Sequence, residues 1–378
     1  MKKSFIIIAA TLLAVGCASD SIRNTVVEDN YRPIGFGESY IGKKTKAFVG
    51  EINDSASLAK DGNTLKVWGW KNVKDVKTQV FNNQKVTFKA ASTQATTKWE
   101  YSPLKYWDMA AKNYLFIAVA PDTSKFTLSS DTLVKLTGIT EPVLALYDNN
   151  GASQITSSNT EAVDFLVADK VFKAPKGNAS DDDVQFTFSH ILSKLTVRVK
   201  TTSNFDNEGD NYPQIKLTDL SIKLQGMCPN FEQKTVGELT AADVDGDIWS
   251  GTALAETEYT CFALGGSVDS LLLKGAGGTN DVDTVAAYLI APTATGTTSP
   301  ALAAKEYTYT ATVGYEIIYS ATEKEHFLAE DKEISTLKSF VQNTSNTLTI
   351  TIDPKAIYFD VKTVKDWTDG VDGTLTVE

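Results

Sequence analysis

The chain has 378 residues, of which 36 are Lys or Arg and 47 are Asp or Glu, and its formal net charge is −11. An acidic surface repels nucleic-acid phosphates and anionic lipid head groups, so we exclude DNA, RNA and charge-driven membrane binding as functions. With 2 histidines, 3 cysteines and no CxxC or HExxH motif, the sequence offers few transition-metal ligands, and we predict neither a metal site nor another cofactor.

The N-terminal segment MKKSFIIIAATLLAVGC has the layout of a bacterial export signal. Two lysines precede an apolar run from Phe5 to Leu13 that is too short to span a bilayer. The ending AVGC resembles a lipobox, in which the cysteine, here Cys17, is acylated and becomes the mature N-terminus. We therefore expect residues 1–16 to be a signal peptide; its removal takes away two lysines and no acids, which moves the net charge from −11 to −13. The alternative is a plain signal peptide that contains a cysteine.

A polar, acidic tether and a first strand follow the signal. Residues 17–32 have little apolar content, and we expect a lipidated, flexible tether there. From Pro33 to Ile41 apolar and polar residues alternate, with Ile34, Phe36 and Tyr40 on one face, which predicts a strand. Gly42 and the basic run KKTK end this strand.

Further short alternating segments predict strands as far as residue 168. They are Thr64–Trp70, Gln84–Ala90, Trp99–Tyr101, Tyr114–Ala120, Leu144–Tyr147 and Ala162–Ala168. No segment keeps helical apolar spacing over three turns, so we predict an all-β protein and not an α/β one.

Residues 174–183 (APKGNASDDD) form the sharpest change in composition, and we place a domain boundary there. A second set of strand segments follows: Val184–Lys200, Ile215–Leu224, Tyr259–Leu264, Ala286–Ala291, Tyr307–Tyr319, Thr347–Ile352 and Ile357–Val361. Many strands separated by turn residues favour two antiparallel β-sandwiches, over residues 33–178 and 179–378.

The remaining residues with reactive side chains do not form a catalytic set. If Cys17 is acylated, Cys228 and Cys261 are an even pair in an oxidising compartment and could form a disulfide; two buried free thiols are the equal alternative. His190 lies in a strand-like run and is typical of a core histidine, whereas His326 falls in a charged segment that we expect to be an exposed loop. We predict that the chain is not an enzyme.

An aromatic cluster precedes the Tyr114–Ala120 segment. It comprises Trp99, Tyr101, Tyr106 and Trp107. Such rings could form a platform that stacks on sugars, but aromatic side chains at strand ends more often cap a sandwich core. We favour the core interpretation.

Four short motifs occur in a fixed order along the chain. They are IGF with GKKTKA (residues 34–47), YW with YLFIAVAP (106–121), DFLVA with FTFSHILSKL (164–195) and IYFDV with VKDW (357–367). Together they resemble the fimbrillin family of Bacteroidales, the lipoprotein-derived pilins and their relatives. The resemblance extends over nearly the whole mature chain.

The resemblance implies an all-β fold of two tandem transthyretin-like antiparallel β-sandwich domains and a place in a surface fimbrium at the outer membrane. Many family members are cut after a basic residue in the loop that follows the first strand, and the groove left by that strand is filled by a neighbouring subunit. Here Ile34, Phe36 and Tyr40 would be displaced, with cleavage after Lys46. The family position is commonly Arg, and an Arg-specific protease would instead cut at Arg32, which opens no groove.

The strand donated to a neighbour would come from residues 356–378, with Ile357, Phe359 and Val361 on one face. The alternative is that this strand closes its own sandwich. The expected partners are other fimbrial subunits, the outer membrane through the lipid, and a host or glycan ligand. The alternative function is a lipid-anchored surface binding module, for glycans or a host ligand, that does not polymerise.

Overall fold

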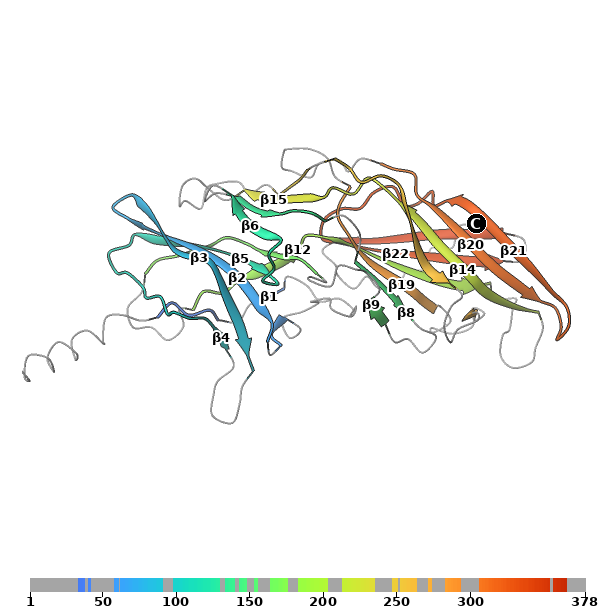
Figure 1. Ribbon diagram of the computed structural model, residues 1–378, viewed down its shortest axis with the longest axis horizontal. Helices are drawn as coiled ribbons and strands as arrows, with labels where there is room; N and C mark the ends of the chain where they lie inside the picture. Colours follow the sequence, from blue (N-terminus) through green and yellow to red (C-terminus); the bar gives the residue numbers. More distant parts are fainter. Residues whose placement is uncertain are drawn as a thin grey trace, which may run out of the picture.

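The computed structural model describes a protein built of β-strands in four sheets (Figure 1). The described residues are 33–37, 40–41, 58–60, 62–90, 98–129, 133–139, 143–147, 153–155, 164–175, 183–202, 213–234, 247–250, 252–263, 271–273, 283–293, 306–353 and 356–365. The predicted all-β class is confirmed. Lys46 and Cys17 lie outside the described residues.

The first sheet has eight strands and occupies one end of the elongated molecule (Figure 1). Its order is β1 (Tyr40–Ile41), β12 (Thr187–His190), β10 (Leu166–Ala168), β5 (Asn113–Ala120), β2 (Thr64–Val73), β3 (Val76–Lys89) and β4 (Lys98–Glu100), with β11 (Val171–Lys173) also paired to β5. The β2–β3 hairpin turns at Lys74 and Asp75, whose φ angles are +51° and +61°. Two positive φ angles are the requirement of a two-residue type I′ turn, which matches the twist of the flanking strands.

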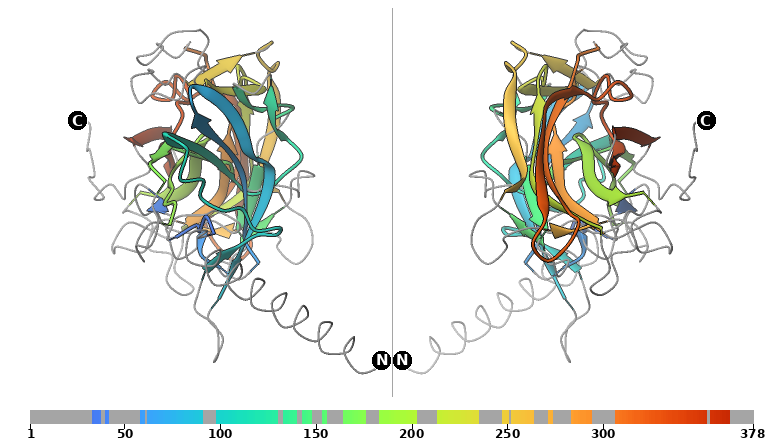
Figure 2. Two further views of the ribbon diagram at one scale, coloured as in Figure 1. Left: turned by 90° about the vertical axis from the view of Figure 1, so that its left-hand side faces the viewer. Right: turned by 90° about the vertical axis from the view of Figure 1, so that its right-hand side faces the viewer.

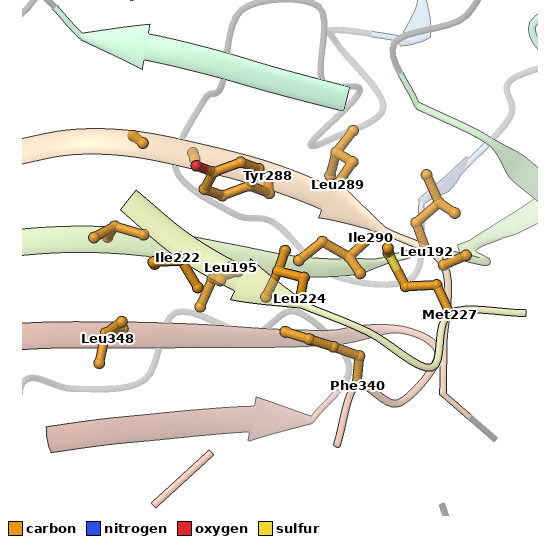
Figure 3. Packing of buried hydrophobic residues seen from close by; sticks show 14 of the residues in the cluster. Leu192, Leu195, Ile222, Leu224, Met227, Tyr288, Leu289, Ile290, Phe340 and Leu348 are labelled. Carbon is orange, nitrogen blue, oxygen red and sulfur yellow. The ribbon is translucent and has the colours of Figure 1, made fainter. Parts of the chain in front are cut away.

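Two sheets occupy the other end of the molecule. The six-stranded sheet has the order β23 (Ala356–Lys365), β22 (Thr344–Asp353), β13 (Ser193–Thr201), β19 (Asp283–Ile290), β8 (Val143–Tyr147) and β9 (Ser153–Ile155). The five-stranded sheet has the order β17 (Thr257–Ala263), β14 (Gln214–Leu224), β20 (Thr310–Ile318) and β21 (Lys324–Glu333), with β18 (Leu271–Leu272) also paired to β14. Figure 3 shows side chains of the two sheets in one buried cluster: Leu195 and Tyr288 meet Ile222 and Leu224.

A fourth sheet joins strands that are far apart in the sequence. Its order is β16 (Asp247–Ser250), β15 (Asn230–Lys234), β7 (Leu133–Leu136) and β6 (Phe126–Ser129). Three of the four sheets therefore take strands from both sides of residue 178, where we placed the domain boundary. The division into domains stays a prediction.

The segment around His326 is not the loop that we expected; it is the strand β21. The charged sequence KEHFLAEDKE concealed it, because β21 ends its sheet and its burial pattern leaves most of its side chains in water. His326 itself is exposed, as expected, and its Nδ1 lies 3.1 Å from Oε1 of Glu316 on β20.

Candidate assembly site

The N-terminal segment of residues 33–37 is held on one side by the end of the first sheet. Pro33 and Phe36 form antiparallel bridges to Tyr106 and to Trp99 of β4. The backbone N–H of Ile34 donates a 2.8 Å hydrogen bond to a carbonyl of the loop that follows β4. This side of the segment is thus hydrogen-bonded like a strand of the sheet.

The other side of the same segment is bonded to the opposite margin of that sheet. Phe36 forms a parallel bridge to Val184, and two backbone hydrogen bonds, Val184 N–H to the Gly35 carbonyl (2.8 Å) and Gly37 N–H to the Val184 carbonyl (3.0 Å), fix the pairing. The pairing continues into β1, which runs parallel to β12. Since β12 and β4 stand near the two ends of the sheet order, this N-terminal strand closes the sheet on itself.

The side chains of this strand complete a separate hydrophobic core inside the first sheet. Ile34 is 0% and Phe36 2% exposed. The Phe36 ring packs on four others, with centroid distances of 5.4 to 6.3 Å: Phe81, Tyr101, Phe116 and Phe186. Burial of each such side chain contributes about 1.5–3 kcal/mol. The predicted inward face of the strand is therefore occupied at Ile34 and Phe36; the side chain of Tyr40 lies outside the described residues.

The strand fits its position closely because two of its residues are glycines. A Cβ atom at Gly35 would overlap the carboxylate of Asp183, and one at Gly37 would lie 3.1 Å from the Asp183 Cβ. The face opposite the core is thus covered by Asp183, and glycine lets the backbone approach it.

A tyrosine hydroxyl holds the same strand from the side of β4. The Tyr101 hydroxyl donates a 2.7 Å hydrogen bond to the Ile34 carbonyl and accepts one of 3.2 Å from the Lys105 N–H. Burial raises the pKa of Tyr101 to about 12. The hydroxyl therefore keeps its proton, and its bond to the strand, throughout the neutral range.

The expected donor strand is paired within its own subunit. β23 pairs with β22 without a break over all ten of its residues. Ile357, Phe359 and Val361 are half-buried against the large core, and the Thr363 hydroxyl donates a 2.7 Å hydrogen bond to Oδ1 of buried Asn346. The structure thus shows the closed alternative for this strand. Its donation to a neighbour would break this ladder.

The two described cysteines are free thiols and not a disulfide. The Leu254 N–H donates a hydrogen bond to the Met227 carbonyl, so Cys228, the next residue, lies beside the segment that precedes β17. Cys261 lies seven residues beyond Leu254 in the chain. At about 3.3 Å per residue this is roughly 20 Å along the strand, far more than a disulfide spans. Cys261 instead contacts the Tyr288 hydroxyl at 2.9 Å, and burial raises its pKa to about 12.

The two tryptophans of the aromatic cluster belong to the core and not to an open platform, whereas Tyr106 is exposed. Trp99 is 5% and Trp107 3% exposed. Trp99 packs edge-on against Phe88 at 5.1 Å, and Trp107 against Tyr114 at 4.7 Å. Their indole faces are not available to stack on a sugar, so this structure offers no support for that glycan-binding alternative at these tryptophans.

His190 is buried beside a carboxylate, as expected of a core histidine. It is 2% exposed, and its Nδ1 lies 3.0 Å from Oδ2 of Asp164, which is equally buried. No sequence pattern predicted this pair, since the two residues are 26 positions apart. In the described ranges no cluster of three or more His, Cys, Asp or Glu side chains could hold a metal ion. Nor does this part of the chain include a helix long and apolar enough to cross a membrane.

Comparison with known proteins identifies the family. The chain is 24% identical to the fimbrium subunit Fim1C of Phocaeicola vulgatus over 410 aligned residues, which cover 100% of this chain and 99% of that one. The crystal structure of a fimbrial protein from Bacteroides vulgatus aligns with 87% of this chain and 99% of its own, at 16% identity and a TM-score of 0.46. A family model described as fimbrillin-like matches residues 45–367. Because that match covers well over half of this chain, the chain belongs to the fimbrillin-like family.

Proposed function

We propose that this protein is a cell-surface fimbrial subunit that is assembled when its N-terminal strand is removed and replaced by a strand of a neighbouring subunit. The observation that carries the proposal is the position of residues 33–41. The described parts of this segment, residues 33–37 and 40–41, pair with both margins of the first sheet, and Ile34 and Phe36 fill its core. Yet the segment precedes every other described element. The non-enzymatic character that we predicted agrees with membership of a structural family.

Loss of this strand would leave a groove that needs a replacement. The Val184 N–H and carbonyl and the Lys105 carbonyl would lose their backbone partners. Each buried polar group without a hydrogen bond costs about 1–3 kcal/mol. Phe81, Phe116 and Phe186 would also lose the ring that packs on them. An extended segment with apolar side chains at alternate positions restores both kinds of contact.

The finer features of the proposal follow the family resemblance. Cys17 carries the lipid that holds the precursor at the outer membrane, and cleavage after Lys46 releases the strand. The C-terminal run of residues 356–378 supplies the donor, and the chain forms two tandem transthyretin-like sandwiches. Cleavage after Lys46 agrees with the structure in one respect: it lies beyond β1, which ends at Ile41, and before Leu58, which belongs to the core that remains.

The test compares the chain that keeps the strand with one that starts at Ala47. We expect the shortened chain to form oligomers that resist dodecyl sulfate, and the longer chain to form none that resist it. An excess of a peptide of residues 33–41 should block assembly by filling the groove. A matched peptide with Ile34→Asp and Phe36→Asp should not block it, since both positions are buried. A shortened chain that stays monomeric would instead favour the binding module that does not polymerise.

A further inference from the structure

The strand β23 forms a regular edge of its sheet. In the described part of the chain it pairs only with β22 and ends the six-stranded sheet, and the register from Asp353–Ala356 to Thr344–Lys365 has no shift. In the views of Figure 2 it lies at the lateral margin of the molecule. A long, regular edge presents a row of backbone N–H and C=O groups that another strand can bind.

β21, which ends the five-stranded sheet, is protected in a way that β23 is not. β21 carries charges on both faces, a register shift opposite β20, and a positive φ of +48° at Asp331. Charges and bulges of this kind are the usual means of preventing edge-to-edge pairing. β23 has neither a register shift nor a positive φ. Its edge is therefore better suited to strand addition than the edge of β21.

The side chains of β23 are arranged on two different faces. The cross-strand partners of its odd-numbered residues are the buried positions of β22, so Ile357, Phe359 and Val361 face the core. The even-numbered Asp360 and Lys362 face away from it. Tyr358, on the same outer face, is 58% exposed although it is aromatic.

We propose that the edge of β23 binds β23 of a second copy of this chain, antiparallel and with Val361 at the twofold axis. In an antiparallel ladder hydrogen-bonded and non-bonded pairs alternate, so two identical strands must pair residues of equal parity. With Val361 at the axis, Asp360 lies opposite Lys362 of the second copy, and the symmetry makes this ion pair twice. Directly opposite Cβ atoms are about 4.5–5.5 Å apart, which is within reach of an ion pair.

The neighbouring registers are excluded by charge. Shifting the axis to position 360 places the two Asp360 carboxylates opposite each other, and shifting it to 362 places the two Lys362 ammonium groups opposite each other. Like charges directly opposite one another destabilise a sheet. Charge complementarity thus selects both the second copy as the occupant and its register.

A groove lies beside the edge of β23, and an added strand would cover it. A cavity of about 640 Å³ lies between β23 and the β20–β21 hairpin, lined by residues that include Tyr315, Ala329, Ile357 and Phe359. The inward side chains of a strand added to β23 would lie over this groove. An interface of one strand pair is small and belongs to the weak, reversible class. Its effect would be lateral contact between precursors that are concentrated at a surface and have not yet donated β23.

The test is sedimentation velocity on the chain that keeps its N-terminal strand, with Cys17→Ser to omit the lipid. Because the N-terminal groove stays filled, this result does not depend on the proposed strand exchange. We expect a reversible dimer at concentrations up to the order of 100 µM. Asp360→Lys and Lys362→Asp should each weaken it by roughly tenfold or more, because each turns two attractive pairs into two repulsive ones. Glu330→Lys on β21 makes the same change in net charge as Asp360→Lys and should have no effect.

Mixing the two single variants gives the sharpest result. In a mixed pair, the new lysine at position 360 and the native Lys362 both lie opposite carboxylates, so we expect the equimolar mixture to regain the dimer. This recovery also shows that both variants are folded. A chain that stays monomeric, a dimer that is insensitive to both substitutions, or a mixture that does not recover would overturn the proposal. So would a dimer that forms only after deletion of residues 366–378, since the edge would then belong to the chain's own tail.

Discussion

Substitution of Phe36 by alanine tests how much the N-terminal strand contributes to the first core. The ring is 2% exposed and packs on four aromatic rings, so Phe36→Ala removes most of a buried side chain and leaves a cavity between the two margins of the sheet. Core Phe→Ala substitutions cost about 3–5 kcal/mol, and loss of well-oriented ring pairs places this one in the upper part of that range. We expect the free energy of unfolding to fall by about 4–5 kcal/mol.

The assay is guanidinium unfolding of the chain that keeps the strand, followed by tryptophan fluorescence. Trp99 and Trp107 are buried in the same core and report on it directly. Tyr106→Ala is the matched control: it removes an aromatic ring from the same region, but Tyr106 is 47% exposed, so a loss below about 1 kcal/mol is expected. A loss below about 1 kcal/mol for Phe36→Ala as well would refute the conclusion that the strand is part of the core.

Three further predictions concern single groups. Tyr101→Phe keeps the ring but removes the hydroxyl that bonds the Ile34 carbonyl, and should cost about 0.5–1.5 kcal/mol in the same unfolding assay; no change would mean that the bond does not hold the strand. The pKa of Cys261 is raised to about 12, so this thiol should resist alkylation at pH 9 in the native chain and react after unfolding, as mapped by mass spectrometry. The same shift means that its contribution to stability is complete at neutral pH and is lost as the pH rises above about 8.5 toward 12. Gly226→Ala should destabilise the chain by more than Gly62→Ala, because both have positive φ but only the former places a Cβ against a tyrosine ring; equal melting temperatures would contradict this.

The sequence predicted the strands better than their pairing. Alternation from Pro33 to Ile41 marked the N-terminal strand, and Ile34 and Phe36 are indeed buried. Its position between β4 and β12 could not be predicted, because β12 begins about 150 residues later in the chain and alternation carries no information on the neighbour of a strand.

Two other differences have physical causes. β8 and β9 precede the composition break at residues 174–183 but belong to the sheet of β19, with which β8 pairs. The register of such long-range pairs is decided by the packing of whole sheets and not by local composition. β21 was not predicted because its sequence is highly charged, as is common for an outer strand. Such a strand has too few buried positions to show an apolar period of two.

The central claim is that the N-terminal strand leaves the subunit when fimbriae assemble. The most direct test is the intact mass and N-terminal sequence of this protein in fimbriae sheared from its native cells. The account predicts a chain that begins at Ala47, without residues 33–41. Assembled subunits that still begin at Cys17 and keep the strand would contradict it.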